Sequence, residues 1–327
     1  MGIDGLAYKR RYGYRRARFE TPMNTAVVAI IAAAIGLPIG SFLNVVIWRV
    51  PRNASVVRPP SHCPGCDQPI KPYDNIPVVS WILLRGKCRR CSTRISGRYP
   101  FIEAATAASF AAIGARFGQS IVVVPLLVLT AALIALCAID IEHLLLPNRV
   151  VYPTGFMVVP LFALSAAVDD QWNAFGRAAL GGLVAFAVFY AIWFAAPKAM
   201  GFGDVRLSFI LGFAAAYFGW STLGYALFLP FLLGSVGGIA IAAPIVLIPM
   251  TVGGALGYAS GRAVMRSYQG VEPVDVTQAR LVVATVFAVM LGSLVYLVLA
   301  AMKRVERGRH IPFGPYLAAG AIIAICI

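Results

Sequence analysis

The stretch "TAVVAIIAAAIGLPIGSFLNVVIW" (residues 25–48) is an apolar run without a single charged side chain. A helix of this length crosses the hydrocarbon core of a bilayer, which requires about 20 apolar residues. The basic residues 1–24 that precede it lack the small-residue cleavage site of a signal peptide. We therefore expect residues 25–48 to be a retained first transmembrane helix that follows a basic N-terminal extension.

Further apolar runs fill most of the chain after residue 100. They cover residues 101–117, 119–139, 149–167, 175–196, 205–220, 222–261, 281–302 and 312–327. The chain is 60% hydrophobic and only 13% charged, whereas a soluble domain carries about 25% charged residues. The runs are long and lack the alternation of a membrane barrel. The sequence predicts an all-α polytopic membrane protein with eight to ten transmembrane helices, depending on how often 222–261 crosses.

Residues 49–100 form the only sizeable polar segment, with ten Lys and Arg residues against Asp67 and Asp74. The positive-inside rule places this segment in the cytoplasm. We expect it to be a small domain inserted after the first helix, followed by a transmembrane domain over 101–327. The net charge of +15 lies in such connections, a pattern that favours contacts with the lipid bilayer over nucleic-acid binding.

Two CxxC pairs lie in this polar segment, "CPGC" (63–66) and "CRRC" (88–91). The thiolates of Cys63, Cys66, Cys88 and Cys91 can converge on one tetrahedral Zn²⁺. Two disulfides or a redox pair are alternatives, but disulfides are disfavoured in the cytoplasm and no thioredoxin-like pattern surrounds either pair. Sulfur would fill all four metal positions, so the predicted zinc is structural.

Two aspartates occupy the edges of apolar runs. Asp140 ends a run in "AIDIEHLLLPNRV" (138–150), and Asp204 opens another in "AMGFGDVRLSF" (199–209). Taken alone, Asp140 is an interfacial residue and Asp204 a helix cap. Simple alternation of the helices, however, places both at the cytoplasmic boundary, where ionisable groups are functional candidates.

Two carboxylates brought together share one proton, so one can activate water while the other protonates a scissile carbonyl. This is the arrangement of an aspartic protease. The chain contains neither HExxH nor GxSxG, so zinc and serine intramembrane proteases have no support.

Five motifs, in order along the chain, resemble the type IV prepilin peptidase family of leader peptidases and N-methyltransferases. They are "GSFLNVVIWRVP" (40–51), the cysteine segment (63–103), "IDIEHLLLPN" (139–148), "GFGDVRL" (201–207) and "IPFGPYLAAGA" (311–321). Arg206 stands where the family usually has lysine, and the apolar stretch 244–302 exceeds the usual eight-helix plan.

The resemblance implies that Asp140 and Asp204 are catalytic and cut a basic leader from prepilins or pseudopilins at the cytoplasmic face of a bacterial inner membrane. It also implies methylation of the new N-terminus from S-adenosylmethionine. Gly40, Ser41, Asn44 and Arg49 match a segment associated with that second activity. Pilus or secretion machinery is the implied partner.

Three other interpretations remain open at this point. Presenilin-type proteases share the GxGD motif but need a PAL motif, which this chain lacks. A transporter that moves protons or cations would carry ionisable groups deep in several helices, whereas the acids here gather at one boundary. A non-catalytic assembly factor is the third.

Overall fold

The computed structural model describes residues 25–118, 120–195, 197 and 200–230, with isolated positions 317, 318, 321 and 325. Expectations for the tail (1–24), for most of 222–261, and for 281–302 and most of 312–327 lie outside the described residues. Within the described ranges the regular structure is helical, with two isolated β-bridges and no strand. The predicted all-helical class is confirmed.

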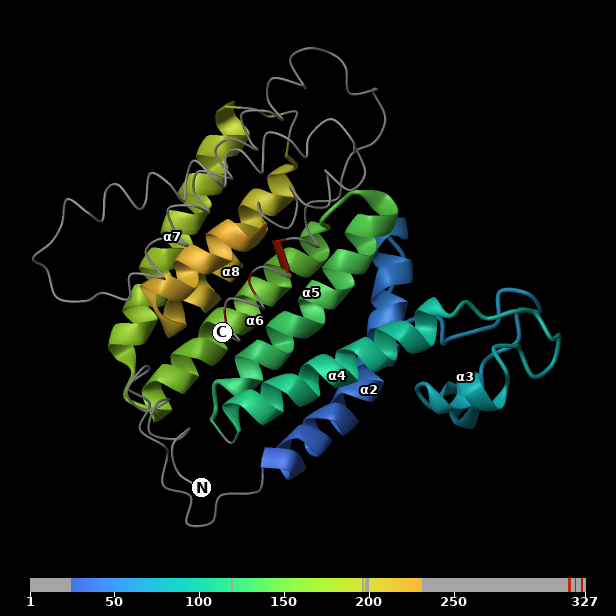
Figure 1. Ribbon diagram of the computed structural model, residues 1–327. Helices are drawn as coiled ribbons and strands as arrows, with labels where there is room; N and C mark the ends of the chain where they lie inside the picture. Colours follow the sequence, from blue (N-terminus) through green and yellow to red (C-terminus); the bar gives the residue numbers. More distant parts are fainter. Residues whose placement is uncertain are drawn as a thin grey trace, which may run out of the picture. The chain divides into compact units, whose positions relative to one another are not determined.

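Six long helices account for most of the described chain (Figure 1). They are α2 (Thr25–Arg49), α4 (Arg98–Phe117), α5 (Val123–His143), α6 (Asn148–Val168), α7 (Trp172–Ala195) and α8 (Phe202–Phe218). Each coincides with a predicted apolar run to within a few residues at either end. Four described segments are long and apolar enough to cross a membrane: Thr25–Arg52, Val123–His143, Asn148–Val168 and Trp172–Ala195.

The polar segment between α2 and α4 folds as a small insert, as predicted. It contains two 3₁₀ helices, η1 (Val50–Arg52) and η2 (Pro72–Asn75), and the short helix α3 (Val79–Leu83). Its two β-bridges join His62 to Pro69 and Lys87 to Arg94. The remainder consists of turns, so the insert has little regular structure to hold its shape.

Helix α2 packs closely along α4 (Figure 1). A Cβ on Gly40 would lie only 2.7 Å from the Cα of Glu103. Small residues at such a crossing let two helices approach backbone to backbone. Leu43 and Ile47 of α2 then join Ile139 of α5 in one buried cluster, which fixes the end of α5 beside both helices.

Helix α7 packs along α8 in the same way (Figure 1). A Cβ on Gly212 would lie 2.3 Å from the Cβ of Ala185. The Arg177 side chain donates hydrogen bonds of 2.7 Å to the carbonyl oxygens of Ala216 and Tyr217. These are among the last carbonyls of α8, which have no partner within the helix itself. Both contacts hold α8 in place.

The insert and the ends of three helices meet at one end of the helix bundle. Asn44 of α2 donates a 3.1 Å hydrogen bond to the carbonyl of Tyr99 at the start of α4. Arg98, the first residue of α4, pairs with Glu142 near the end of α5. We call this the insert end; it is where the chain leaves α2, enters α4 and leaves α5.

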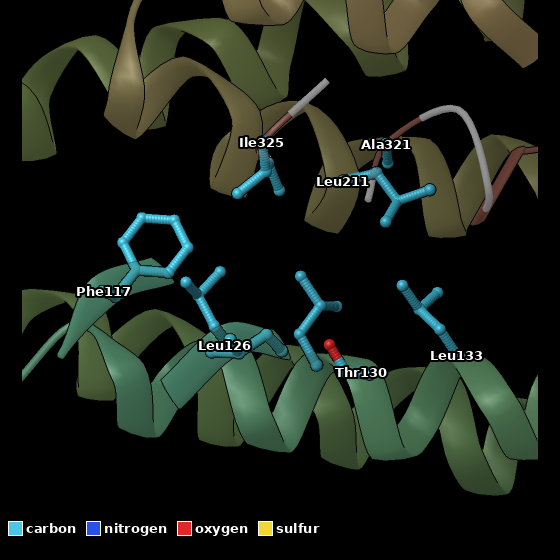
Figure 2. A pocket seen from close by; sticks show the side chains of 9 residues that line it. Phe117, Leu126, Thr130, Leu133, Leu211, Ala321 and Ile325 are labelled. Carbon is cyan, nitrogen blue, oxygen red and sulfur yellow. The ribbon is translucent and has the colours of Figure 1, made fainter. Parts of the chain in front are cut away.

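A small apolar pocket lies between α5 and α8 (Figure 2). Phe117, Leu126 and Leu133 line one side, and Leu211 and Ile325 line the other. Leu133, the lining residue of α5 nearest to Asp140, precedes it by seven residues, which is about 10 Å along a helix. The pocket is therefore separate from the aspartates.

Candidate active site and metal centre

Asp140 and Asp204 are both buried in the structure. Asp140 lies near the C-terminal end of α5 and is 6% exposed; Asp204 lies in the first turn of α8 and is 7% exposed. Their segments are in contact, because Leu146, six residues after Asp140, packs against Gly203, the residue before Asp204. Burying two acids together is costly and marks a functional site by default.

Asp204 is not the N-cap residue of α8, although its carboxyl group hydrogen-bonds the backbone of Gly201. The cap position is Gly201, which has no side chain, and the Asp204 amide donates to the Gly201 carbonyl at 3.1 Å. The Asp204 Oδ1 atom is buried and has no hydrogen-bond partner among the described residues. A buried carboxylate oxygen needs such a partner, so this atom is suited to accept one from water or substrate.

The chain after α5 passes directly over the start of α8. Leu144 ends α5 in the left-handed conformation with φ 53°, and its amide donates to the Asp140 carbonyl at 2.9 Å. Two residues later, Leu146 meets the glycine that precedes Asp204: a Cβ on Gly203 would lie 2.8 Å from the Leu146 Cβ. The GFGD segment thus needs glycine at 203 to approach the LLLPN segment.

Arg206 joins the same two segments. Its guanidinium donates to the side-chain oxygen of Asn148 at the start of α6. The guanidinium also lies over the rings of Phe202, at 4.6 Å, and Tyr152, at 5.7 Å. Sequence reasoning left Arg206 without a role, because the partner is set by helix packing and not by a motif.

Glu142 and His143 lie near the C-terminal end of α5, just after Asp140. Glu142 forms an ion pair with Arg98, and His143 Nε2 lies 3.9 Å from the second Glu142 oxygen. The Arg98–Glu142 ion pair connects the N-terminal end of α4 to the C-terminal end of α5. Glu142 lies two residues after Asp140. Arg98 belongs to the cysteine segment (63–103), and no sequence pattern pairs it with Glu142.

The four cysteines of the two CxxC pairs come together. Their sulfur atoms all lie within 4.8 Å of one another, and Cys63 Sγ is 3.7 Å from Cys91 Sγ. A tetrahedral Zn²⁺ with Zn–S bonds of about 2.3 Å requires sulfurs about 3.8 Å apart. Cys63, Cys66, Cys88 and Cys91 therefore form a cluster that fits a metal ion such as zinc.

The two cysteine knuckles repeat the same backbone pattern. The Cys63 amide donates to the Gln68 carbonyl, and the Cys88 amide donates to the Thr93 carbonyl, both at 2.9 Å. One residue after each CxxC pair, the backbone turns through positive φ, 54° at Asp67 and 57° at Ser92. This matched geometry presents two sulfurs from each knuckle, as a four-sulfur site demands.

The electrostatics of the insert favour thiolate on one side of the cluster. Hydrogen bonding with Thr93 lowers the pKa of Cys91 to about 6, which favours the thiolate form of this sulfur. The thiolate is the form that binds metal. Nearby, Arg89 forms a bidentate ion pair with Asp74, and its hydrogen bond lowers the pKa of that carboxyl.

Gly40, Ser41 and Asn44 gather where α2 meets the start of α4. Gly40 faces the Glu103 backbone, the Ser41 side chain hydrogen-bonds Glu103, and Asn44 also bonds the Gly40 carbonyl at 3.3 Å. Arg49 lies at the end of α2 and is separate from them. It donates to the backbone carbonyls of Ser55 and Pro59 in the insert, at 2.9 and 2.6 Å.

Glu103 is a buried acid that sequence reasoning did not single out. Its Oε2 accepts a 2.7 Å hydrogen bond from the amide of Val78 in the insert. Val78 has φ 61° and ψ −51°, and the Val79 amide closes a γ-turn on the Pro77 carbonyl at 2.6 Å. A β-branched residue in this conformation is strained by about 1–3 kcal/mol, so Glu103 holds a strained junction.

Comparisons with known proteins match most of the chain. Residues 34–117 match the bacterial peptidase A24 N-terminal domain, and residues 127–242 match the type IV leader peptidase family. No solved structure matches.

Curated relatives carry the name prepilin leader peptidase/N-methyltransferase. One from Stutzerimonas stutzeri is 33% identical over 92% of this chain and 91% of its own length. One from Pseudomonas aeruginosa is 35% identical over 63% of this chain and 78% of its own length. One from Myxococcus xanthus is 39% identical over 64% of this chain, and the match spans 62% of that relative.

Proposed function

The chain belongs to the type IV leader peptidase family, and we propose that it cleaves the basic leader from type IV prepilins or pseudopilins and then methylates the new N-terminus. The match over 91% of a relative with both activities in its name supports this function. So does the family model over the segment that contains both aspartates. The enzyme is thus an endopeptidase with a methyltransferase activity.

Asp140 and Asp204 are the proposed catalytic pair. The observation that carries this assignment is their joint burial at neighbouring helix ends, with one oxygen of Asp204 open to a new hydrogen bond. In the proposed reaction the pair holds one proton between them. The ionised carboxylate removes a proton from water, and the protonated carboxyl donates its proton to the carbonyl oxygen of the scissile bond.

The second half of the reaction returns the site to its starting state. Water oxygen has by then formed a bond to the carbonyl carbon, which is tetrahedral. As the C–N bond breaks, the leaving amine takes the proton that the first aspartate accepted from water. The hydroxyl formed from the carbonyl oxygen returns its proton to the other aspartate as the C=O bond forms again. One shared proton therefore remains on the pair, and no metal or covalent intermediate is needed.

We place the insert end at the cytoplasmic face of a multi-pass inner membrane. The ten basic residues of 49–100 support this orientation, because cytoplasmic loops are enriched in Lys and Arg. A prepilin with a cytoplasmic leader and a membrane-embedded helix would then present its cleavage site at the level of the aspartates. Pilus or secretion machinery would receive the product.

The metal held by Cys63, Cys66, Cys88 and Cys91 is proposed to be a structural Zn²⁺. With four sulfur ligands the ion has no open position for catalysis, and it supplies a cross-link between the two knuckles. Such a cross-link suits an insert with little regular structure and a small core.

S-adenosylmethionine is the proposed methyl donor, and it supplies an electrophilic methyl group to the new N-terminal amine. Gly40, Ser41, Asn44 and Arg49 are proposed to serve this activity. Their contacts with α4 and the insert support a role in positioning the insert against the membrane helices.

The test of the peptidase is cleavage of a prepilin by the purified full chain in vesicles. Asp140→Asn and Asp204→Asn each remove one carboxylate while preserving shape. We expect each to lower the cleavage rate at least about 100-fold, because general acid–base groups contribute that much or more. Normal cleavage by either variant would rule out the pair.

Asp170→Asn is the matched control, because Asp170 is exposed in the turn between α6 and α7, away from the insert end. It should cleave at the wild-type rate. Transfer of a labelled methyl group to pre-cleaved substrate tests the second activity by itself. Both aspartate variants should retain this transfer, which also shows that they are folded.

A further inference from the structure

One face of the insert is apolar and exposed. Ile76, Val79, Ile82 and Leu83 form what we call the α3 surface, and Ile82 and Leu83 are 61% and 75% exposed. The opposite side of the same helix is turned inward, since Ser80 is buried and Trp81 donates a 3.1 Å hydrogen bond to the Ile95 carbonyl. The short helix therefore has an anchored side and an uncovered apolar side.

The α3 surface begins beside α4. Val78, the residue directly before α3, donates its amide to Glu103 in the second turn of α4. This hydrogen bond ties the start of α3 to the level at which α4 begins. Two further hydrogen bonds attach the insert at that level, from Arg49 at the end of α2 to the carbonyls of Ser55 and Pro59.

Aromatic side chains mark the same level as the headgroup region. Trp48 at the end of α2 and Tyr99 and Phe101 at the start of α4 are all exposed. Trp and Tyr are enriched at the membrane–water interface, where the ring is half in and half out of the apolar phase. A helix tied to this level therefore meets lipid headgroups and not bulk water.

The charges beside the α3 surface select the kind of partner. Arg85 and Lys87 lie two and four residues after the end of α3 and are exposed. The insert has only two acids, Asp67 and Asp74, and Asp74 is paired with Arg89. Basic side chains next to apolar ones favour an anionic lipid surface. A basic peptide would be repelled by the same charges.

We propose that the α3 surface is a lipid-docking surface: Ile76, Val79, Ile82 and Leu83 enter the acyl boundary of the membrane, and Arg85 and Lys87 contact anionic headgroups. Docking adds a lipid attachment to the three protein contacts that hold the insert. The proposal is independent of the peptidase and methyltransferase assignments, because it concerns where the insert lies and not what it catalyses.

The experiment places a photoreactive amino acid at position 82 or 83 of the full chain. The protein is reconstituted in vesicles of phosphatidylethanolamine and phosphatidylglycerol, irradiated and analysed by mass spectrometry. Position 68 is the matched control, since Gln68 is exposed on a knuckle of the same insert. Metal content is measured for each variant, so that only proteins with an intact cysteine cluster are compared.

We expect phospholipid adducts at 82 and 83 at least tenfold above those at 68. Arg85→Ser together with Lys87→Ser should reduce the adducts with phosphatidylglycerol. The proposal would be overturned if positions 82 and 83 formed adducts with protein in place of lipid. That protein could be an added prepilin, a second copy of this chain, or another part of the same molecule. Equal lipid labelling at 68, or no adduct from an intact photoreactive group, would overturn it as well.

Discussion

Arg206 near the start of α8 donates a hydrogen bond to the side chain of Asn148, the first residue of α6. Both residues lie at the insert end, one two residues after Asp204 and the other eight after Asp140. Gly203 and Leu146 make a second contact between the same segments. The two aspartate motifs are thus connected by residues that neither hold substrate nor carry a proton in the proposed reaction.

Loss of the Arg206–Asn148 contact should misplace Asp204 relative to Asp140. We expect Arg206→Ala to lower the cleavage rate about 10- to 100-fold, since small displacements of catalytic groups have effects of that size. Arg206→Lys should retain much of the rate, because an ammonium can still donate to Asn148, although it lacks the planar guanidinium that lies over Phe202.

A double-mutant cycle checks this prediction. Arg206→Ala and Asn148→Ala should be strongly non-additive in cleavage, as expected for residues in contact. Arg149→Ala, at the exposed neighbour of Asn148, is the control and should behave like wild type. Additive effects of the two contact variants would show that the hydrogen bond does not position the site.

Gly203→Ala should abolish most cleavage without unfolding the bundle. The added methyl would lie 2.8 Å from the Leu146 Cβ, closer than two carbons can approach, so one segment must move. Overpacking of this kind costs about 1–3 kcal/mol. Gly224→Ala is the control, since a Cβ there meets nothing within 4 Å.

A second substitution shows whether Gly203→Ala acts through the contact with Leu146 or through a general folding defect. Leu146→Gly removes the atom that a methyl at 203 would strike, so the double variant should recover part of the cleavage rate. The measurement is the initial rate on one prepilin at saturating concentration. If the double variant were no better than Gly203→Ala, the close approach of the two segments would not explain the glycine.

The broad plan of the site follows from patterns that can be read along the chain. Helix alternation places Asp140 and Asp204 at the same end, and the spacing of the CxxC pairs brings four sulfurs together. Each inference needs only run lengths and a ligand motif, which are local properties. The predicted runs stop at residue 139 and start at residue 205, whereas α5 continues to His143 and α8 begins at Phe202, so both aspartates lie inside the helix ends.

The supporting contacts could not be predicted in this way. The Arg206–Asn148 and Val78–Glu103 hydrogen bonds join residues 58 and 25 positions apart, and both depend on how helices and loops pack. No residue-type pattern distinguishes Glu103 from an ordinary interfacial acid. Gly40 and Asn44 suit a cofactor site and a helix crossing equally well by composition, and only the structure shows their contacts with α4.

Glu103→Ala should loosen the insert. It removes the acceptor of the Val78 amide, and an unsatisfied buried donor costs about 1–3 kcal/mol. Limited trypsin digestion in vesicles measures the effect, because Arg85 and Lys87 offer exposed cleavage sites in the insert. We expect faster cutting there than in wild type, and a larger fall in methyl transfer than in leader cleavage.

Two variants test whether the strained turn at Val78 explains the loosening of the insert in Glu103→Ala. Glu103→Gln keeps an acceptor oxygen and should digest more slowly than Glu103→Ala. Val78→Gly relieves the positive φ, since glycine adopts it freely, and should restore trypsin resistance when combined with Glu103→Ala. Digestion of Glu103→Ala at the wild-type rate would mean that the hydrogen bond does not hold the insert.

Zinc removal should unfold the insert while the helix bundle stays folded. We expect the purified protein to hold about one Zn²⁺ per chain, and Cys63→Ser or Cys88→Ser to lose most of it, because each removes a ligand of a four-sulfur site. Metal analysis measures the loss, and trypsin digestion should accelerate in parallel within 50–97. Cys137→Ser, in α5 and outside the cluster, should keep its metal. Full metal content in the Cys63→Ser, Cys88→Ser double variant would reject these cysteines as the ligands.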